Sequence, residues 1–250
     1  MLAKLLRSRR SPVSLPAIPA GERVYAIGDV HGCLDELDRL LALIDADDAA
    51  RVPSRTTLIF LGDLIDRGPA SAQVVERVRR LMIERSVRCL TGNHEEVFLH
   101  ALDGDAKALK LFCRIGGRET ALSYGLSADE YEHADYQELE TALSRLVPIE
   151  HRAMLEAGED MIVVGDYLFV HAGIRPQASL DDQRTADLRW IRDTFLDHDR
   201  PLEKMVVHGH TITDTVETRP HRIGIDTGAF DSGVLTALGL EGADRWTLQS

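Results

Sequence analysis

The sequence predicts an α/β protein whose functional residues lie beyond the carboxyl ends of its strands. Before about residue 100, a buried strand followed by a helix occurs three times in succession, and this alternation predicts a largely parallel sheet. A short polar segment rich in glycine or asparagine follows each of these strands. In open α/β sheets, such segments meet at one edge and form the site. Shorter strands return later in the chain and predict a second sheet packed on the first.

Each predicted element follows from hydrophobic spacing. Apolar runs predict the first three strands, at 24–27, 56–61 and 87–91. Apolar residues at helical spacing predict helices from about residue 34, after Pro69 and from near His94. The later strands are expected at 161–164, 167–170, 205–208, 222–226, 234–240 and 245–248. Because these strands are close together in the sequence, we expect them to pair antiparallel within the second sheet.

Composition shifts along the chain suggest its domain organisation. Residues 1–21 are predicted to be a flexible tail, and 22–250 a single domain. A basic amphipathic tether at 1–10 is the alternative to a frayed terminus. Between about 103 and 160 the chain becomes charged and mostly helical, with no strong strand signal. This segment, called the helical insert below, is predicted to form a cap.

The overall charge limits the classes of partner. The formal net charge is −12 over 250 residues, which argues against binding to a nucleic-acid polymer. An acidic chain can still accept a phosphorylated substrate, because bound metal ions invert the local charge. Three cysteines (Cys33, Cys89 and Cys113) follow no zinc or redox spacing and fit a reducing, cytoplasmic compartment. No stretch reaches transmembrane length, so we expect no integral membrane segment.

The first two strands are followed by residues suited to a divalent metal ion. Asp29 and His31 are two positions apart, so in an extended segment both side chains project to one side and can bind one ion. Taken alone, an ordinary turn with a solvated Asp and His is an equally good interpretation. Asp63 follows the second strand, and its carboxylate could be shared by two ions.

Three later residues would complete a second metal site. Asn93 follows the third strand and offers a neutral oxygen ligand. His171 and His210 each follow an apolar strand and offer imidazole nitrogens. A pair of cations held in this way would activate a bridging hydroxide for in-line attack on phosphorus. The sequence therefore favours a phosphoester hydrolase with two metal ions.

The same segments supply candidates for acid catalysis and phosphate binding. His94 is the predicted general acid, and Asp66 is the carboxylate expected to orient it. Arg67 is expected to bind phosphate oxygens with its guanidinium, and Asn93 is also assigned to phosphate binding. Arg192 is the candidate for a second arginine on the opposite side, where a surface ion pair is about as good an interpretation.

Together, the segments at 28–32 (GDVHG), 62–68 (GDLIDRG) and 92–95 (GNHE) resemble the calcineurin-like metallophosphoesterases. Within these, the chain is similar to the serine/threonine phosphoprotein phosphatases, especially compact bacterial and phage members. The resemblance implies a four-layer α/β/β/α sandwich and a dinuclear site. The expected metal is Mn²⁺, with Fe, Zn or Mg as alternatives. The resemblance also implies the same metal ligands and the same acid pair that the residues themselves suggest.

Two positions at which this chain differs from a related group of hydrolases bear on its substrate. Diadenosine tetraphosphate hydrolases of bacteria also resemble this chain, but they typically have Ala where Asp66 stands and Asp where Glu95 stands. Both differences favour a serine/threonine protein phosphatase acting on a phosphorylated protein or peptide. The alternative is a hydrolase of diadenosine tetraphosphate or another nucleotide. The insert is expected to shape the substrate cleft and so to decide between them.

Overall fold

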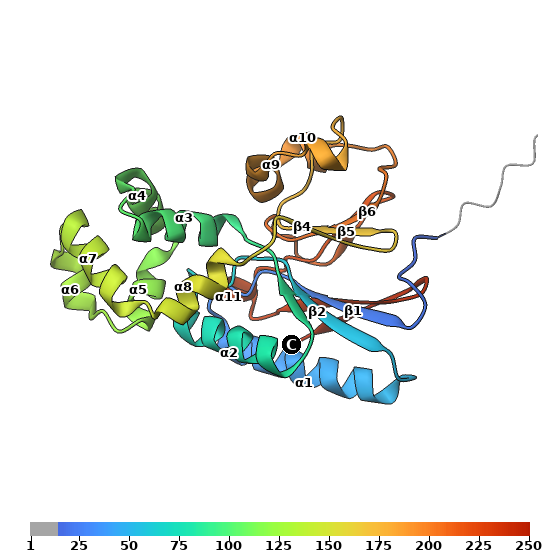
Figure 1. Cartoon of the computed structure of the whole chain (residues 1–250), viewed down its shortest axis with the longest axis horizontal. Coiled ribbons are helices and arrows are strands. Elements are labelled where there is room, and N and C mark those ends of the chain that lie inside the picture. Colours follow the sequence, from blue (N-terminus) through green and yellow to red (C-terminus); the bar gives the residue numbers. More distant parts are fainter. Residues whose placement is uncertain (1–14) are drawn as a thin grey trace, which may run out of the picture.

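A computed structural model describes residues 15–250 (Figure 1). The suggested tether at 1–10 lies outside the described residues. Residues 15–21 belong to the segment that we expected to be a flexible tail, yet they pack against the domain. Ile18 is only 3% exposed, and its backbone N–H donates to the carbonyl of Gly242. Among residues 15–250, no helix is both long and apolar enough to cross a membrane.

The first sheet contains strands from both ends of the described chain. Its strands run in the order β10-β9-β1-β2-β3. Their bounds are β1 (Glu22–Ile27), β2 (Arg55–Phe60), β3 (Val87–Cys89), β9 (Thr236–Glu241) and β10 (Asp244–Gln249). Strands β1, β2 and β3 are parallel, whereas β9 is antiparallel to both β1 and β10. The three predicted βα units therefore form the parallel half of this sheet.

The second sheet has the order β4-β5-β6-β8-β7. Its strands are β4 (Met161–Val164), β5 (Tyr167–Val170), β6 (Met205–His208), β7 (Glu217–Thr218) and β8 (Arg222–Gly224). Our expectation that all the late strands pair antiparallel in this sheet was wrong in two respects. Strands β5, β6 and β8 run parallel, and β9 and β10 belong to the first sheet. Strand β9 fits there because Ala237 packs on one face while Leu238 and Leu240 pack on the other.

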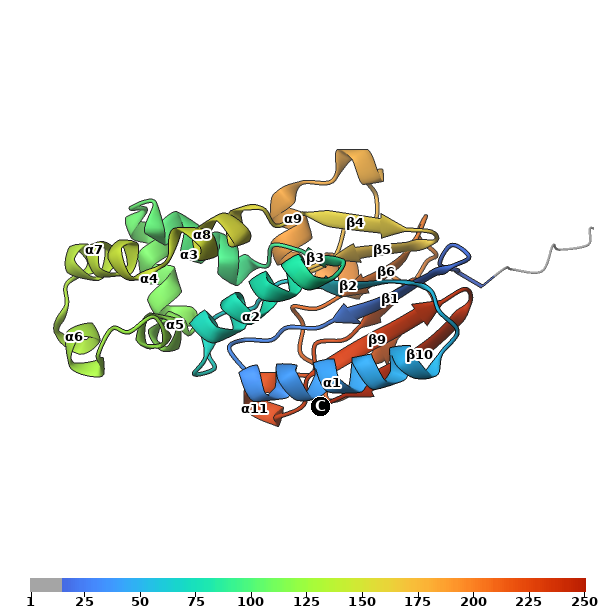
Figure 2. The same ribbon diagram turned by 60° about the horizontal axis from the view of Figure 1, so that its bottom comes forward.

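The alternation of side chains in β1 explains the layers. Tyr25 and Ile27 pack against α1 (Leu34–Ala50) and α2 (Ser71–Glu84), while Val24 and Ala26 pack between the two sheets. On the far side, Leu168 of β5 belongs to a cluster that includes residues of α9 (Thr185–Trp190) and α10 (Asp193–Leu196). The result is the four-layer α/β/β/α sandwich that the resemblance implies (Figures 1 and 2).

The helical insert lies at one end of the sandwich, beyond α2 (Figure 2). It follows α3 (Asn93–Leu102), and its helices are α4 (Ala106–Ile115), α5 (Gly117–Ser123), α6 (Ala128–His133), α7 (Tyr136–Leu146) and α8 (Ile149–Glu156). Phe112 of α4 stacks on Phe98 of α3 with ring centroids 5.1 Å apart. Both rings belong to the cluster that covers the outer face of the first sheet. The core of the insert is therefore continuous with that of the sandwich.

Candidate metal and phosphate site

The loops that follow β1, β2, β3, β5 and β6 meet at one edge of the two sheets. Backbone hydrogen bonds connect them directly. The N–H of His31 donates to the carbonyl of Asp63 at 2.9 Å, and the N–H of Gly209 donates to that of His171 at 2.8 Å. The backbone N–H of His210 in turn donates to the Asp29 carboxylate. Loops from both sheets thus bring the sequence-predicted residues into one site.

The backbone of this site is strained. Among residues 15–250, left-handed φ values outside glycine occur at five positions, all of them predicted site residues: His31 (46°), Asp63 (50°), Asp66 (72°), Arg67 (68°) and His210 (63°). Such a conformation costs a non-glycine residue about 1–3 kcal/mol and persists where its surroundings hold it. Strain of this kind gathers at functional sites.

Gly62 allows the loops to approach closely. Its φ is 96°, and an added Cβ would lie 2.6 Å from the backbone nitrogen of Gly92 and 3.0 Å from Nδ1 of His171. A side chain at this position would therefore force apart the loops that carry Asp63 and Asn93.

Two groups of buried side chains could hold metal ions. Potential ligand atoms of His31, Asp63 and His94 lie within 4.8 Å of one another, as do those of Asp63, His171 and His210. Asp63 belongs to both groups, which is the arrangement expected of a shared carboxylate. His94, which we assigned to acid catalysis, is itself a member of the first group.

The orientation of the imidazoles suits metal binding. Nδ1 of His31 lies 2.7 Å from the carbonyl of Ile65, and Nδ1 of His171 lies 2.8 Å from that of Leu61. Donating from Nδ1 leaves the lone pair of Nε2 free in each ring. Nε2 of His31 and Nε2 of His210 are buried and have no hydrogen-bond partner among residues 15–250. Buried nitrogens without a partner are costly in the absence of a ligand, so these residues fit a metal site.

Asn93 lies inside the second group. Its Oδ1 is 3.0 Å from Nε2 of His171. The same Nε2 lies 3.4 Å from Oδ2 of Asp63 and 3.2 Å from Nδ1 of His210. Carboxylate, amide and imidazole atoms therefore converge at this point, and such a mixed oxygen and nitrogen set suits a small divalent ion.

Burial keeps the three imidazoles neutral, which is the state that a metal ligand needs. It lowers the pKa of His31 and of His210 to about 3, and it also lowers the pKa of His171. Burial alone would raise the pKa of Asp63, but the neighbouring histidines (His171, His94 and His31) outweigh it and the pKa is lowered. Metal binding requires neutral imidazoles and an ionised carboxylate, and these directions of the pKa values favour both.

Asp29 lies beside the metal-capable groups rather than within either of them. Its two oxygens accept the backbone N–H of His210 at 3.0 and 3.2 Å. Burial and the nearby carboxylates of Asp226 and Asp63 raise its pKa well above the ordinary value. Acidic groups gathered in this way would be stabilised in their charged form by divalent cations.

His94 and Asp66 form the predicted pair. Nδ1 of His94 lies 2.6 Å from Oδ2 of Asp66, and Nε2 lies 3.1 Å from the guanidinium of Arg67. Burial lowers the pKa of His94, but the carboxylates of Asp63 and Asp66 outweigh it and the pKa is raised. A raised pKa suits a group that donates a proton near neutral pH.

The two arginines lie in different surroundings. The half-buried guanidinium of Arg67 stands over the ring of Phe230, 4.8 Å from its centroid. Arg192 is exposed, and its guanidinium lies 3.4 Å from Oγ1 of Thr211, the residue after His210. Arg67 therefore adjoins the first metal-capable group and Arg192 the second.

Sequence reasoning missed the structural role of Glu95. Its carboxylate accepts backbone N–H bonds from Asp63 at 2.8 Å, from Leu64 at 2.8 Å and from Gly92 at 2.9 Å. It thereby fixes the turn that carries the shared carboxylate. An acidic residue at the third position of a helix is a capping signal, but that signal could not show that Glu95 also binds a distant loop.

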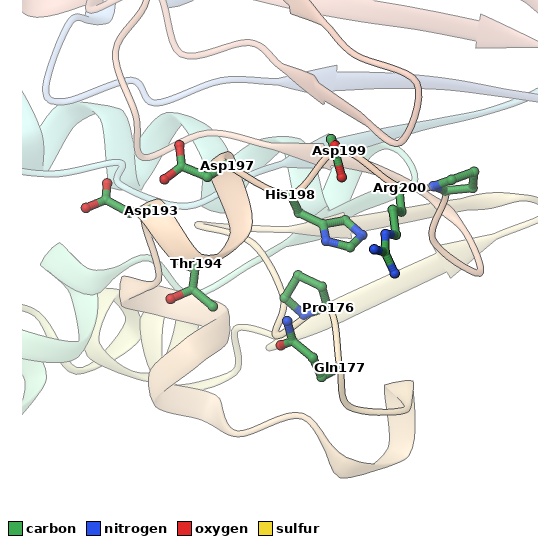
Figure 3. A pocket seen from close by; sticks show the side chains of 9 residues that line it. Pro176, Gln177, Asp193, Thr194, Asp197, His198, Asp199 and Arg200 are labelled. Atoms are coloured by element: carbon green, nitrogen blue, oxygen red, sulfur yellow. The ribbon is translucent and has the colours of Figure 1, made fainter.

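One cavity lies away from these groups. It has a volume of about 870 Å³ and borders α10 and the segment that follows it (Figure 3). Asp193, Asp197 and Asp199 line it, together with His198 and Arg200. The excess of carboxylates would repel a phosphate, and none of the residues proposed for the metal or phosphate site lines this cavity.

Comparisons with known proteins indicate the family. The family model of the calcineurin-like phosphoesterases matches residues 22–231. The asymmetrical bis(5′-nucleosyl)-tetraphosphatase PrpE of Anoxybacillus flavithermus is 28% identical over 232 residues, covering 85% of this chain and 88% of that protein. The symmetrical bis(5′-nucleosyl)-tetraphosphatase of Methylococcus capsulatus is 35% identical over 153 residues, which cover 61% of this chain and 44% of that protein. This chain thus matches less than half the length of the symmetrical relative.

Solved structures share the fold. A candidate diadenosine tetraphosphatase superimposes with a TM-score of 0.62 at 21% identity, covering 95% of this chain and 99% of that one. A protein serine/threonine phosphatase from Saccharomyces cerevisiae gives a TM-score of 0.56 at 14% identity, covering 94% and 84%. With the family model matching most of its length, the chain belongs to the calcineurin-like phosphoesterases.

Proposed function

We propose that this protein is a metal-dependent hydrolase of dinucleoside polyphosphates, with diadenosine tetraphosphate as the substrate to test first. The observation that carries the proposal is the similarity to PrpE, which extends over 85% of this chain and 88% of that protein. We expected a serine/threonine protein phosphatase from Asp66 and Glu95. The comparisons favour the nucleotide alternative, because similarity over most of the chain weighs more than two motif positions.

The site also offers a surface for a nucleobase. The ring of Phe230 is 38% exposed and lies edge-to-face with His31 at 5.5 Å, next to Arg67. Exposed aromatic rings bind flat apolar groups well. A base packed here would place its phosphates close to the metal-capable groups.

In this proposal, two divalent ions are held by the groups described above. His31 and Asp63, with Asp29 beside them, would hold one ion; Asp63, Asn93, His171 and His210 would hold the other. The donors suit Mn²⁺ first, with Fe, Zn and Mg as alternatives. The ions would supply Lewis-acid stabilisation of the phosphoryl oxygens and activation of water.

The chain's own residues would bind the substrate and move the proton. Arg67 and Arg192 would bind phosphate oxygens from two sides. Arg67 now donates to Nε2 of His94, and a bound phosphate would draw its N–H groups away from that nitrogen. Nε2 could then carry the proton that the leaving oxygen needs, while Asp66 holds Nδ1–H.

A phosphoserine or phosphothreonine phosphatase remains the second candidate. The contact between Asp66 and His94 favours it, because the resemblance associates this carboxylate with the protein phosphatases. The two candidates share the metal chemistry and differ in the leaving group.

Parallel assays with the Mn²⁺-loaded protein separate the candidates. Nucleotide products from diadenosine tetraphosphate would be resolved by chromatography, and phosphate release would be measured from phosphoserine and phosphothreonine peptides. We expect rapid cleavage of the dinucleotide, with ATP and AMP as products if cleavage is asymmetrical. Rapid peptide turnover with little dinucleotide cleavage would overturn the proposal. Asp63→Asn serves as the control for metal-dependent turnover.

A further inference from the structure

We propose that Thr120 is a positioning residue for the acid pair, and that the helical insert thereby forms part of the catalytic site. The proposal rests on the role given above to His94 as proton donor. It assigns to the insert a task besides shaping the substrate cleft.

Thr120 contacts Asp66 at two points. Its Oγ1 lies 2.6 Å from Oδ1 of Asp66 and 2.9 Å from the backbone nitrogen of the same residue. Both residues are 0% exposed. A hydroxyl has one proton and can accept through its lone pairs. Thr120 can therefore donate to the carboxylate while it accepts the backbone N–H, which fixes the main chain and the side chain of Asp66 together.

The two oxygens of Asp66 serve different partners. Oδ2 lies 2.6 Å from Nδ1 of His94, while Oδ1 binds Thr120. Rotation of the carboxylate would break both contacts at once. The hydrogen bond from Thr120 therefore restrains the oxygen that orients the imidazole, and a buried hydrogen bond to a charged group is stronger than a neutral one.

Ser71 contacts both Asp66 and Thr120. Its Oγ lies 3.0 Å from the backbone nitrogen of Asp66 and 3.0 Å from Oγ1 of Thr120. Ser71 begins α2 and is also fully buried. Thr120 thus connects α5 of the insert both to the start of α2 and to the loop that follows β2.

The insert also supports the residue after Asp66. The backbone N–H of Arg67 donates to the carbonyl of Gly116 at 3.1 Å, and Gly116 lies between α4 and α5. Asp66 and Arg67 are consecutive and both have left-handed φ. Such a pair needs support from its surroundings, and the insert provides contacts to both residues.

The experiment compares Thr120→Val, Thr120→Ser and the control Ser123→Ala in the Mn²⁺-loaded full chain. Valine keeps the branched shape without the hydroxyl, and serine restores the hydroxyl. Ser123 is on the same helix, and its hydroxyl contacts Ala72 and the carbonyl of Thr120 rather than Asp66. The substrates are two series of aryl esters. One series consists of esters of inorganic phosphate, and the other of esters of the terminal phosphate of ATP. In each series the leaving group ranges from p-nitrophenol to phenol.

A positioning role makes the effect depend on the leaving group. General acid catalysis contributes about 10²–10⁴-fold, and a misoriented acid should lose part of it. We expect Thr120→Val to lower kcat about tenfold for phenyl esters and less than about twofold for p-nitrophenyl esters, with KM nearly unchanged. Serine should restore most of the loss, and Ser123→Ala should behave like the parent. A loss equal across the series, or no loss, would overturn the proposal.

His94→Asn separates this proposal from the mechanism on which it rests. If Thr120 acts through His94, adding Thr120→Val to His94→Asn should lower kcat little further. Additive losses would remove Thr120 from the positioning role, while a leaving-group-independent loss in His94→Asn itself would remove the acid role. The substrate class is indicated separately, by whether the protein turns over the esters of ATP or the simple phosphate esters. If the valine variant does not fold, the same comparison is made between Thr120→Ala and Thr120→Ser.

Discussion

Nε2 of His94 lies 3.9 Å from Oδ2 of Asp63, the carboxylate that both metal-capable groups share. The opposite nitrogen of the same ring is held by Asp66. The imidazole therefore lies between a carboxylate that orients it and one that belongs to the candidate metal site. In the proposed mechanism, Nε2 of this ring would supply the proton beside the carboxylate that the two metal ions would share.

The first prediction concerns His94. His94→Asn should lower kcat by about 10²–10⁴-fold for poor leaving groups, because the proton donor is lost. Metal content should stay close to that of the parent, because His94 is assigned to proton transfer and none of the proposed metal ligands is changed. Steady-state kinetics and metal analysis after dialysis check this. Unchanged turnover of a substrate with a poor leaving group would exclude the acid role.

The second prediction concerns Asp63. Because Asp63 belongs to both groups, Asp63→Asn should weaken the binding of both ions together. His171→Asn should mainly weaken the second ion. Metal titration by calorimetry measures both affinities, with the exposed Asp38→Asn as a surface control. Loss of a single ion in Asp63→Asn would contradict the shared assignment.

The third prediction concerns Gly116. Its φ is 119°, and an added Cβ would lie 2.8 Å from the backbone nitrogen of Arg67. Gly116→Ala should therefore displace Arg67 and lower kcat/KM by about 10- to 100-fold, as small misplacements in a site can do. Gly125 provides a matched control, because its φ is 101° but nothing lies within 4 Å of an added Cβ. Equal kinetics for the two alanine variants would argue against support of Arg67 by the insert.

The fourth prediction concerns pH and His221. The side chain is 3% exposed and lies edge-to-face with His198 at 5.3 Å. Burial lowers the pKa of His221, as do the positive charges of His198, Arg222 and Arg219, while Asp199 opposes them. Below the ordinary value of 6.5, the unfolded chain therefore binds more protons here than the folded chain does. The free energy of unfolding should fall as pH drops through this range.

Urea unfolding at pH 7.5 and 5.5, with metal in excess, measures this dependence. His221→Phe should reduce the loss of stability at the lower pH, whereas His133→Phe, at an exposed position on α6, should leave it unchanged. The same pH dependence in His221→Phe as in the parent would show that His221 makes no such contribution.

The sequence determined much of the site because its residues belong to short motifs at the ends of predicted strands. Each strand-ending motif brings its own side chains, and hydrophobic spacing predicted the parallel strands that place Asp29, Asp63 and Asn93 at one edge. The segments from the second half were predicted as well, since His171 and His210 also follow apolar strands. These features depend on residues that are near one another in the chain.

Tertiary structure alone decided what depends on distant contacts. The placement of β9 beside β1 was missed, because proximity in sequence favoured pairing within the second sheet. The hydrogen bonds between Thr120 and Asp66 join residues 54 positions apart. Those from the backbone of Asp63 and Leu64 to Glu95 join different loops. The sequence pattern of the insert indicates which of its residues are apolar. It does not indicate that the hydroxyl of Thr120 is buried against the carboxylate of Asp66. That choice is made only when the insert packs against the start of α2.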